Sequence, residues 1–227
     1  MQLLPLLTAL IAGFAHALEP DHMAAVTTFV SRRPRPLQAV GFGLRWGVGH
    51  SAAILVVGTV LIALDLRLSE RLARGLEFGV GGMLLGLGVW LLWSVLHERA
   101  HRLADDTSAR VQECESAKVE HAHEHRHGHS HRHSTLWVGM AHGLAGTAPL
   151  VALVATMTSS PWEAGAYLLF FGVGTTLAMG LYAMVAGLVF DQAGMRVPGL
   201  GRVFRTVTAL GSAVLGVAWM AGAVGGA

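Results

Sequence analysis

The sequence predicts an all-α polytopic membrane protein with six transmembrane helices arranged as an inverted repeat of three plus three. Apolar residues make up 53% of the 227 positions and charged residues 13%, and there are 29 glycines. This composition is typical of a chain that buries its apolar surface in lipid rather than in a soluble core. The charged residues cluster between long apolar segments, and the segments of the two halves share short motifs.

Six apolar segments are long enough to cross a bilayer as helices, which takes about 20 residues. The first, second and fifth exceed this length, which allows tilt, a kink or an interrupted helix. The predicted segments are 3–30, 37–64, 76–97, 135–157, 162–190 and 206–226.

Arginine and lysine residues in the connections predict the orientation. Three lie in 31–36, six in 98–134 and three in 191–205, whereas the opposite connections carry only Arg67, Arg71 and Arg74. Because positive residues favour the cytoplasmic side, both termini are expected outside and the long connection 98–134 inside. The formal charge of +2 therefore reflects topology and does not indicate a nucleic-acid partner.

A repeat relates the first and second halves of the chain. The motif at 13–18 (GFAHAL) matches 139–144 (GMAHGL), and 47–51 (GVGHS) matches 172–176 (GVGTT). A weaker match pairs Gly81 and Gly86 with Gly211 and Gly216. Three crossings per unit require the second copy to enter the membrane from the opposite side, and such repeats typically hold a substrate site at their interface.

The predicted organisation is therefore a first repeat at 1–97, a cytoplasmic loop at 98–134 and a second repeat at 135–227. Low hydrophobicity and low complexity predict that the loop is disordered. Seven histidines alternate in it and would form a flexible multidentate chelator, with a plain solvated tail as the alternative. They are His121, His123, His125, His127, His129, His131 and His133.

The first apolar segment contains an ionisable stretch, with His16, Glu19, Asp21 and His22 around Pro20. Ionisable groups at membrane depth are costly and usually mark a substrate or ion path. On an ideal helix Asp21 and His22 lie about 140° and about 240° from His16, so the three would not share a face. Pro20 removes an amide donor and bends the helix, which would bring the side chains together and free the His16 carbonyl.

Imidazole and carboxylate ligands suit Ni²⁺, Co²⁺, Zn²⁺ or Cu²⁺, and the absence of sulfur weakly disfavours Cu⁺. We therefore expect His16, Asp21 and His22 to bind a divalent transition metal, joined by His142, the repeat counterpart of His16. The alternative is a buried polar network that fixes helix packing.

Other polar residues in the apolar segments have weaker predicted roles. His50 lies among glycines and is interpreted as a ligand or gate, since small neighbours let another helix approach. Ser51 and Thr147 could support the site, although hydroxyls in helices often bond only their own backbone. Arg45 could extend toward the cytoplasmic surface or pair with Glu19 or Asp21.

The motifs resemble those of the nickel/cobalt transporter family. His16-x4-Asp21-His22 looks like its HX4DH motif, 49–51 resembles its GHS motif, and 142–147 (HGLAGT) is similar to an element of the urease-accessory-type nickel permeases. The resemblance implies a nickel or cobalt permease of the bacterial inner membrane in which His16, Asp21, His22 and His50 bind metal. The histidine-rich loop resembles that of the efflux branch, which leaves the direction open.

Uptake is the favoured direction, because a divalent cation entering a negative interior gains about 4.6 kcal/mol per 100 mV. Export would need a counter-ion such as H⁺, for which Asp21 and the histidines are candidate carriers. There is no Walker A sequence, so an ATP-driven pump would need another subunit. No cofactor is expected, and a cytoplasmic metallochaperone is a candidate partner.

Two functions of other classes stay open at this point. His97-Glu98-Arg99-Ala100-His101 satisfies the HExxH pattern of zinc proteases. A sensing or storage protein acting through the histidine loop is the second.

Overall fold

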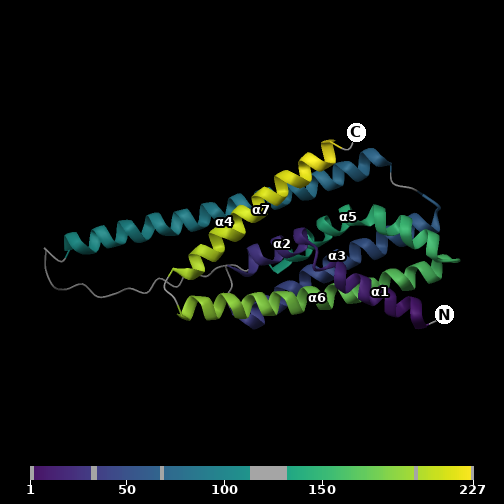
Figure 1. The fold of residues 1–227 in the computed structure, drawn as a ribbon, viewed down its shortest axis with the longest axis horizontal. Helices are drawn as coiled ribbons and strands as arrows, with labels where there is room; N and C mark the ends of the chain where they lie inside the picture. Colours follow the sequence, from purple (N-terminus) through teal and green to yellow (C-terminus); the bar gives the residue numbers. More distant parts are fainter. Residues whose placement is uncertain (1–2, 32–34, 67–68, 113–131, 197–198, 226–227) are drawn as a thin grey trace.

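The computed structural model describes residues 3–31, 35–66, 69–112, 132–196 and 199–225, and this part of the chain is all helical (Figure 1). Its helices are α1 (Leu3–His16), α2 (Pro20–Val30), α3 (Pro36–Ala63), α4 (Glu70–Gln112), α5 (Arg132–Met157), α6 (Pro161–Arg196) and α7 (Leu200–Gly225). The start of α1 and the end of α7 lie toward the same end of the bundle.

The first predicted segment is broken at the ionisable stretch. Helices α1 and α2 meet at an angle of 58°. Pro20 stands in the first turn of α2, where its missing N–H costs no helical hydrogen bond. The expectation of a free His16 carbonyl is wrong, because the Glu19 N–H donates to it at 3.0 Å as the last turn of α1 tightens.

Four helices in the described residues are long and apolar enough to span a membrane, and the bent pair α1–α2 would make a fifth span. The four stretches are Pro36–Ala63, Glu70–Ala100, Pro161–Gln192 and Leu200–Gly225. The remaining predicted segment, 135–157, forms most of α5, which is helical over 26 residues but is not among these candidates. Many large apolar side chains on the outside of the bundle are exposed, as lipid-facing surfaces require.

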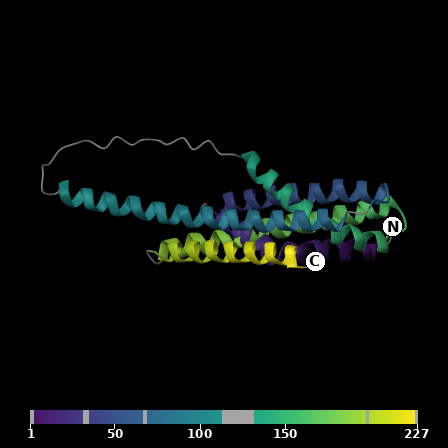
Figure 2. The same cartoon turned by 90° about the horizontal axis from the view of Figure 1, so that it is seen from above.

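Helix α4 is longer than predicted and extends beyond the ends of the other helices (Figures 1 and 2). The sequence predicted a disordered loop from residue 98, but 98–112 are helical. This stretch is polar, but it contains three alanines and three arginines, which favour helix without any apolar environment. Residues 113–131, with most of the histidine-rich stretch, lie outside the described residues.

Glycines bring the helices into close contact. A Cβ on Gly13 of α1 would collide with the Phe171 backbone of α6, and one on Gly139 of α5 would collide with the Trp46 backbone of α3. Helices α4 and α7 approach in the same way where Gly81 faces Gly216. Small residues at such crossings let membrane helices pack backbone to backbone. The close packing fixes α1, α3, α5 and α6 around a shared interior.

Candidate metal site

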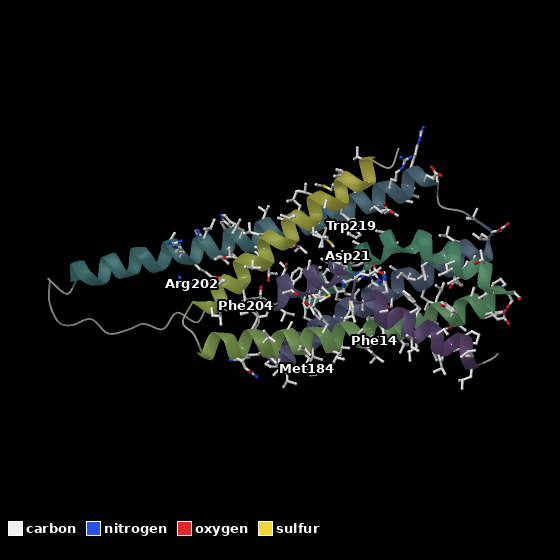
Figure 3. The ribbon with its side chains drawn as sticks, in the orientation of Figure 1. Phe14, Asp21, Met184, Arg202, Phe204 and Trp219 are labelled. Atoms are coloured by element: carbon white, nitrogen blue, oxygen red, sulfur yellow. The ribbon has the colours of Figure 1, made fainter. Side chains whose placement is uncertain are left out.

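Four histidines and one aspartate converge in the interior of the bundle. His16 ends α1, Asp21 and His22 open α2, His50 comes from α3 and His142 from α5. The His22 ring lies at the centre of the group, with its centroid 4.5 Å from that of His16, 4.9 Å from His50 and 4.4 Å from His142. Figure 3 shows Asp21 among the inner helices. These five residues, called here the histidine cluster, are the ones that the sequence predicted as metal-binding.

The break before Pro20 explains how α2 can contribute two neighbouring side chains. Asp21 and His22 stand in the first turn of a new helix, so their directions no longer follow from the rotation of α1. Asp21 is 6% exposed and His22 2% exposed. A carboxylate in the first turn is also favoured by the partial positive charge of the helix N-terminus.

Asp21 joins two histidines through its two oxygens. Oδ1 lies 2.9 Å from His22 Nδ1, and Oδ2 lies 3.0 Å from His142 Nε2. An ionised carboxylate only accepts hydrogen bonds, so each of these ring nitrogens must carry the proton. The bonds therefore leave His22 Nε2 and His142 Nδ1 with lone pairs. Histidines that bind metal are commonly oriented in this way by a carboxylate.

Glu19 makes the same kind of contact with His16. Its Oε1 lies 3.0 Å from His16 Nδ1, which leaves His16 Nε2 as the second nitrogen. The contact joins the last turn of α1 to the residue before α2 and so spans the break. Glu19, predicted as a supporting residue, therefore lies where it can orient His16.

Several buried nitrogens of the histidine cluster have no hydrogen-bond partner among the described residues. They are His16 Nε2, His22 Nε2, both ring nitrogens of His50 and His142 Nδ1. A buried polar atom without a partner costs about 1–3 kcal/mol, so native structures contain few of them. A network that served only helix packing would pair its members. The concentration of free nitrogens at one point favours a ligand-binding role instead.

Two groups in the cluster bring three donor atoms within 4.8 Å of one another: His16, His22 and His50, and Asp21, His22 and His142. Ligand atoms around one Zn²⁺-sized ion, each at about 2.1 Å, lie about 3–4 Å apart. Small side-chain movements would suffice to close either group on an ion. The donors are nitrogen and oxygen, which suits a divalent metal of the Ni²⁺, Co²⁺ and Zn²⁺ class.

The cluster borders a cavity of about 590 Å³. The other walls come from the second and third turns of α4 and α6, from the C-terminal parts of α5 and α7 before their last residues, and from the end of α1. These parts of α4, α5, α6 and α7 lie toward the end of the bundle at which α1 begins and α7 ends. Glu77 and Trp219 belong to this lining, and the sequence analysis did not single them out. Glu77 did carry a signal, as the only charged residue in the apolar segment 76–97.

Aromatic side chains pack on the opposite side of the cluster. The Trp46 ring lies 5.9 Å from that of His142, Phe42 lies 5.9 Å from Trp46, and Phe29 stacks on Phe42 at 4.8 Å. Trp46 and Phe42 are buried. The histidine cluster is thus open to a cavity on one side and covered by aromatic rings on the other.

The remaining predicted residues lie outside the cluster. Ser51 donates to the Gly172 carbonyl of α6 at 2.9 Å, and Thr147 donates to the Gly143 carbonyl of its own helix at 2.8 Å. Arg45 forms no ion pair among the described residues; its guanidinium lies back along α3 near Gly41.

In the HExxH segment of α4, His97 and Arg99 are exposed and Glu98 is half-buried. The Arg205 guanidinium binds both Glu98 oxygens, at 2.8 and 2.9 Å, and His97 stacks on Trp93. A glutamate held by an arginine is poorly placed to act as a general base. The His101 side chain and the loop histidines His121 to His131 lie outside the described residues, and His133 lies in the first turn of α5.

The fold and the cluster define a multi-pass helical membrane protein with a buried group of metal-ligand type. Residues 24–218 match the family described as the cytochrome c biogenesis protein transmembrane region. The urease accessory protein UreH of Bacillus sp. (strain TB-90) is 30% identical over 97% of this chain and 92% of its own length. The chain belongs to this transmembrane family and to the family of UreH, and its relatives support a transporter rather than an enzyme.

More distant relatives are found in an archaeon and a plant. A protein of Methanocaldococcus jannaschii named as a nickel/cobalt efflux system is 32% identical over 45% of this chain and 50% of its own length. Chloroplast protein FOR GROWTH AND FERTILITY 1 of Arabidopsis thaliana is 26% identical over 92% of this chain and 57% of its own length. No solved structure matches the chain.

Proposed function

We propose that the protein carries Ni²⁺ or Co²⁺ across the bacterial inner membrane, more readily inward than outward, and that the ion passes through the histidine cluster. The observation that carries the proposal is the set of unpartnered ring nitrogens buried around His22. The name of the archaeal relative, a nickel/cobalt efflux system, supports the choice of metals.

In this proposal the histidines bind the ion and the carboxylates orient them. His16, His22 and His50 form the first donor group, with His142 completing the site through its Nδ1 atom. Asp21, which the sequence suggested as a direct ligand, has both oxygens bonded to histidines and is proposed as their orienting group. Release of one bond would let it bind the ion, so direct ligation during passage fits the same geometry.

We also propose the six-span inverted repeat, with units 1–97 and 135–227. The close contacts of the glycines are reciprocal: Gly13 meets Phe171, and their repeat counterparts Gly139 and Trp46 meet in the same way. Gly47 faces Thr176, and Gly172 faces Ser51. A two-fold relation between two inverted units would produce such pairs. The third helices of the two proposed units also meet, where Gly81 of α4 faces Gly216 of α7.

The proposed orientation has both termini outside. The cavity would then face the outside and the aromatic rings of Phe29, Phe42 and Trp46 the cytoplasm. The loop histidines would receive or collect metal on the cytoplasmic side, with a metallochaperone as a candidate partner. An outward-facing cavity suits uptake, although an exporter would pass through the same state.

Cellular metal content tests the proposed function. Cells that express the protein should contain several-fold more nickel or cobalt than cells with an empty vector, measured by mass spectrometry. A lowered content would identify export and contradict the favoured direction. Replacing the seven loop histidines by serine should reduce the rate but keep transport. If this variant accumulated no metal while being normally inserted, storage or sensing would explain the function better.

A further inference from the structure

The cavity beside the histidine cluster has a lining suited to cations. Besides the four histidines it contains three carboxylates, Glu19, Asp21 and Glu77, and no arginine or lysine. Two of these carboxylates are engaged, Glu19 with His16 and Asp21 with His22 and His142. The third, Glu77, has no hydrogen-bond or ion-pair partner among the described residues.

Glu77 belongs to a helix that contributes no residue to the histidine cluster. The cluster residues belong to α1, α2, α3 and α5, whereas Glu77 lies in α4, which packs closely on α7 through Gly81 and Gly216. Glu77 stands about 10 Å along α4 from its first residue, at a rise of about 1.5 Å per residue. It is partly buried and belongs to the candidate span Glu70–Ala100.

A structural role does not explain this position. An ionisable side chain in a membrane-spanning helix is costly unless it is paired or faces a polar cavity. Glu77 is unpaired and lines the cavity, beside Val80 of the same helix and Trp219 of α7. It is the only ionisable side chain that α4 and α7 place on the cavity wall, in the part of the chain that the structure describes.

We propose that Glu77 is the carboxylate that captures the hydrated divalent cation in the cavity before the histidines bind it, which rests on the proposed function. Its charge concentrates cations in a cleft of low dielectric, where fields are focused. A carboxylate is a hard ligand that holds a hydrated ion weakly, and imidazole nitrogens then replace water.

The test compares Glu77→Gln with Glu70→Gln, which removes an exposed charge from the same helix, and with Glu77→Asp. Transport of Ni²⁺ by cells gives the concentration for half-maximal rate and the maximal rate. Glu77→Gln should raise the concentration for half-maximal rate about tenfold and leave the maximal rate within about twofold of wild type. The difference from wild type should shrink as ionic strength rises, because salt screens the charge. Glu77→Asp should lie near wild type, and Glu70→Gln should match it.

Three results would overturn the assignment: an unchanged half-saturation concentration in Glu77→Gln, an equal increase in Glu70→Gln, or a difference that is independent of salt. His22→Ala, measured in parallel, separates this from the proposed function, which fails if His22→Ala transports like wild type. If the wild type itself transports nothing, the role of Glu77 is tested by Ni²⁺ binding to purified protein in which the seven loop histidines are replaced by serine, with and without Glu77→Gln. Equal Ni²⁺ affinities of the two proteins would overturn the assignment. A several-fold lower affinity in the Glu77→Gln variant would support it.

Discussion

Replacing His22 by alanine is expected to reduce nickel and cobalt transport to the level of an empty vector. His22 belongs to both donor groups, and its ring lies between those of His16, His50 and His142. Its removal leaves neither group with three donors. The measurement is the initial rate of ⁶³Ni²⁺ uptake by cells, normalised to the amount of protein in the membrane.

Graded variants make this expectation specific. Asp21→Asn keeps every histidine but can no longer accept from both His22 and His142, and loss of such an orienting carboxylate typically lowers metal affinity about 10–100-fold. His97→Ala, which removes a histidine stacked on Trp93 away from the cavity, should transport like wild type. Equal rates in His22→Ala and His97→Ala would contradict a role for the cluster.

Substitution of the glycines at the helix crossings is expected to have the largest effect on folding. Gly13→Ala and Gly139→Ala each place a Cβ against a backbone carbonyl, of Phe171 and Trp46 respectively, which cannot move without shifting a helix. Overpacking of this kind costs about 1–3 kcal/mol. Gly13→Leu and Gly139→Leu are expected to yield almost no folded protein. The measurement is the monodisperse fraction of the protein after detergent extraction.

Gly79→Ala is the matched control, because a Cβ there meets nothing within 4 Å. Alanine in an open helical position is favoured over glycine by about 0.5–1 kcal/mol, so this variant should be as stable as wild type or more stable. In detergent, the unfolding temperatures of Gly13→Ala and Gly139→Ala should be similar to each other and well below that of Gly79→Ala. A large difference between Gly13 and Gly139 would argue against their equivalence in the two repeats.

Local chemistry made much of the site predictable. A proline in the middle of an apolar segment predicts a break, and the break occurs beside Pro20. Ionisable residues cannot face lipid cheaply, so His16, His50 and His142 had to turn toward the interior. The residue types therefore predict that these ligands lie together in one region of the interior.

Details that depend on helix rotation could not be predicted in the same way. Asp21 reaches both His22 and His142 because α2 starts in a new direction after the 58° bend. Ser51 bonds to Gly172 because α3 and α6 cross at that point. The place of Glu77 on the cavity wall follows from the packing of α4 on α7, which one helix's sequence does not specify.

The extension of α4 shows a different limit. The polar composition of 98–112 suggested disorder, whereas its alanines and arginines favour a helix that continues out of the bundle. Low hydrophobicity indicates that a segment lacks a core of its own. It does not exclude a helix that starts inside the membrane region and continues beyond it.

Metal binding by purified protein in which the seven loop histidines are replaced by serine tests the central claim most directly. We predict one Ni²⁺ per chain at equilibrium, with an X-ray absorption spectrum of nitrogen and oxygen ligands that includes three or more imidazoles and no sulfur. The same protein with His22→Ala should bind no Ni²⁺ at the Ni²⁺ concentration that saturates the first protein. Absence of bound Ni²⁺ in the first protein, or full binding in the second, would contradict an ion path through the histidine cluster.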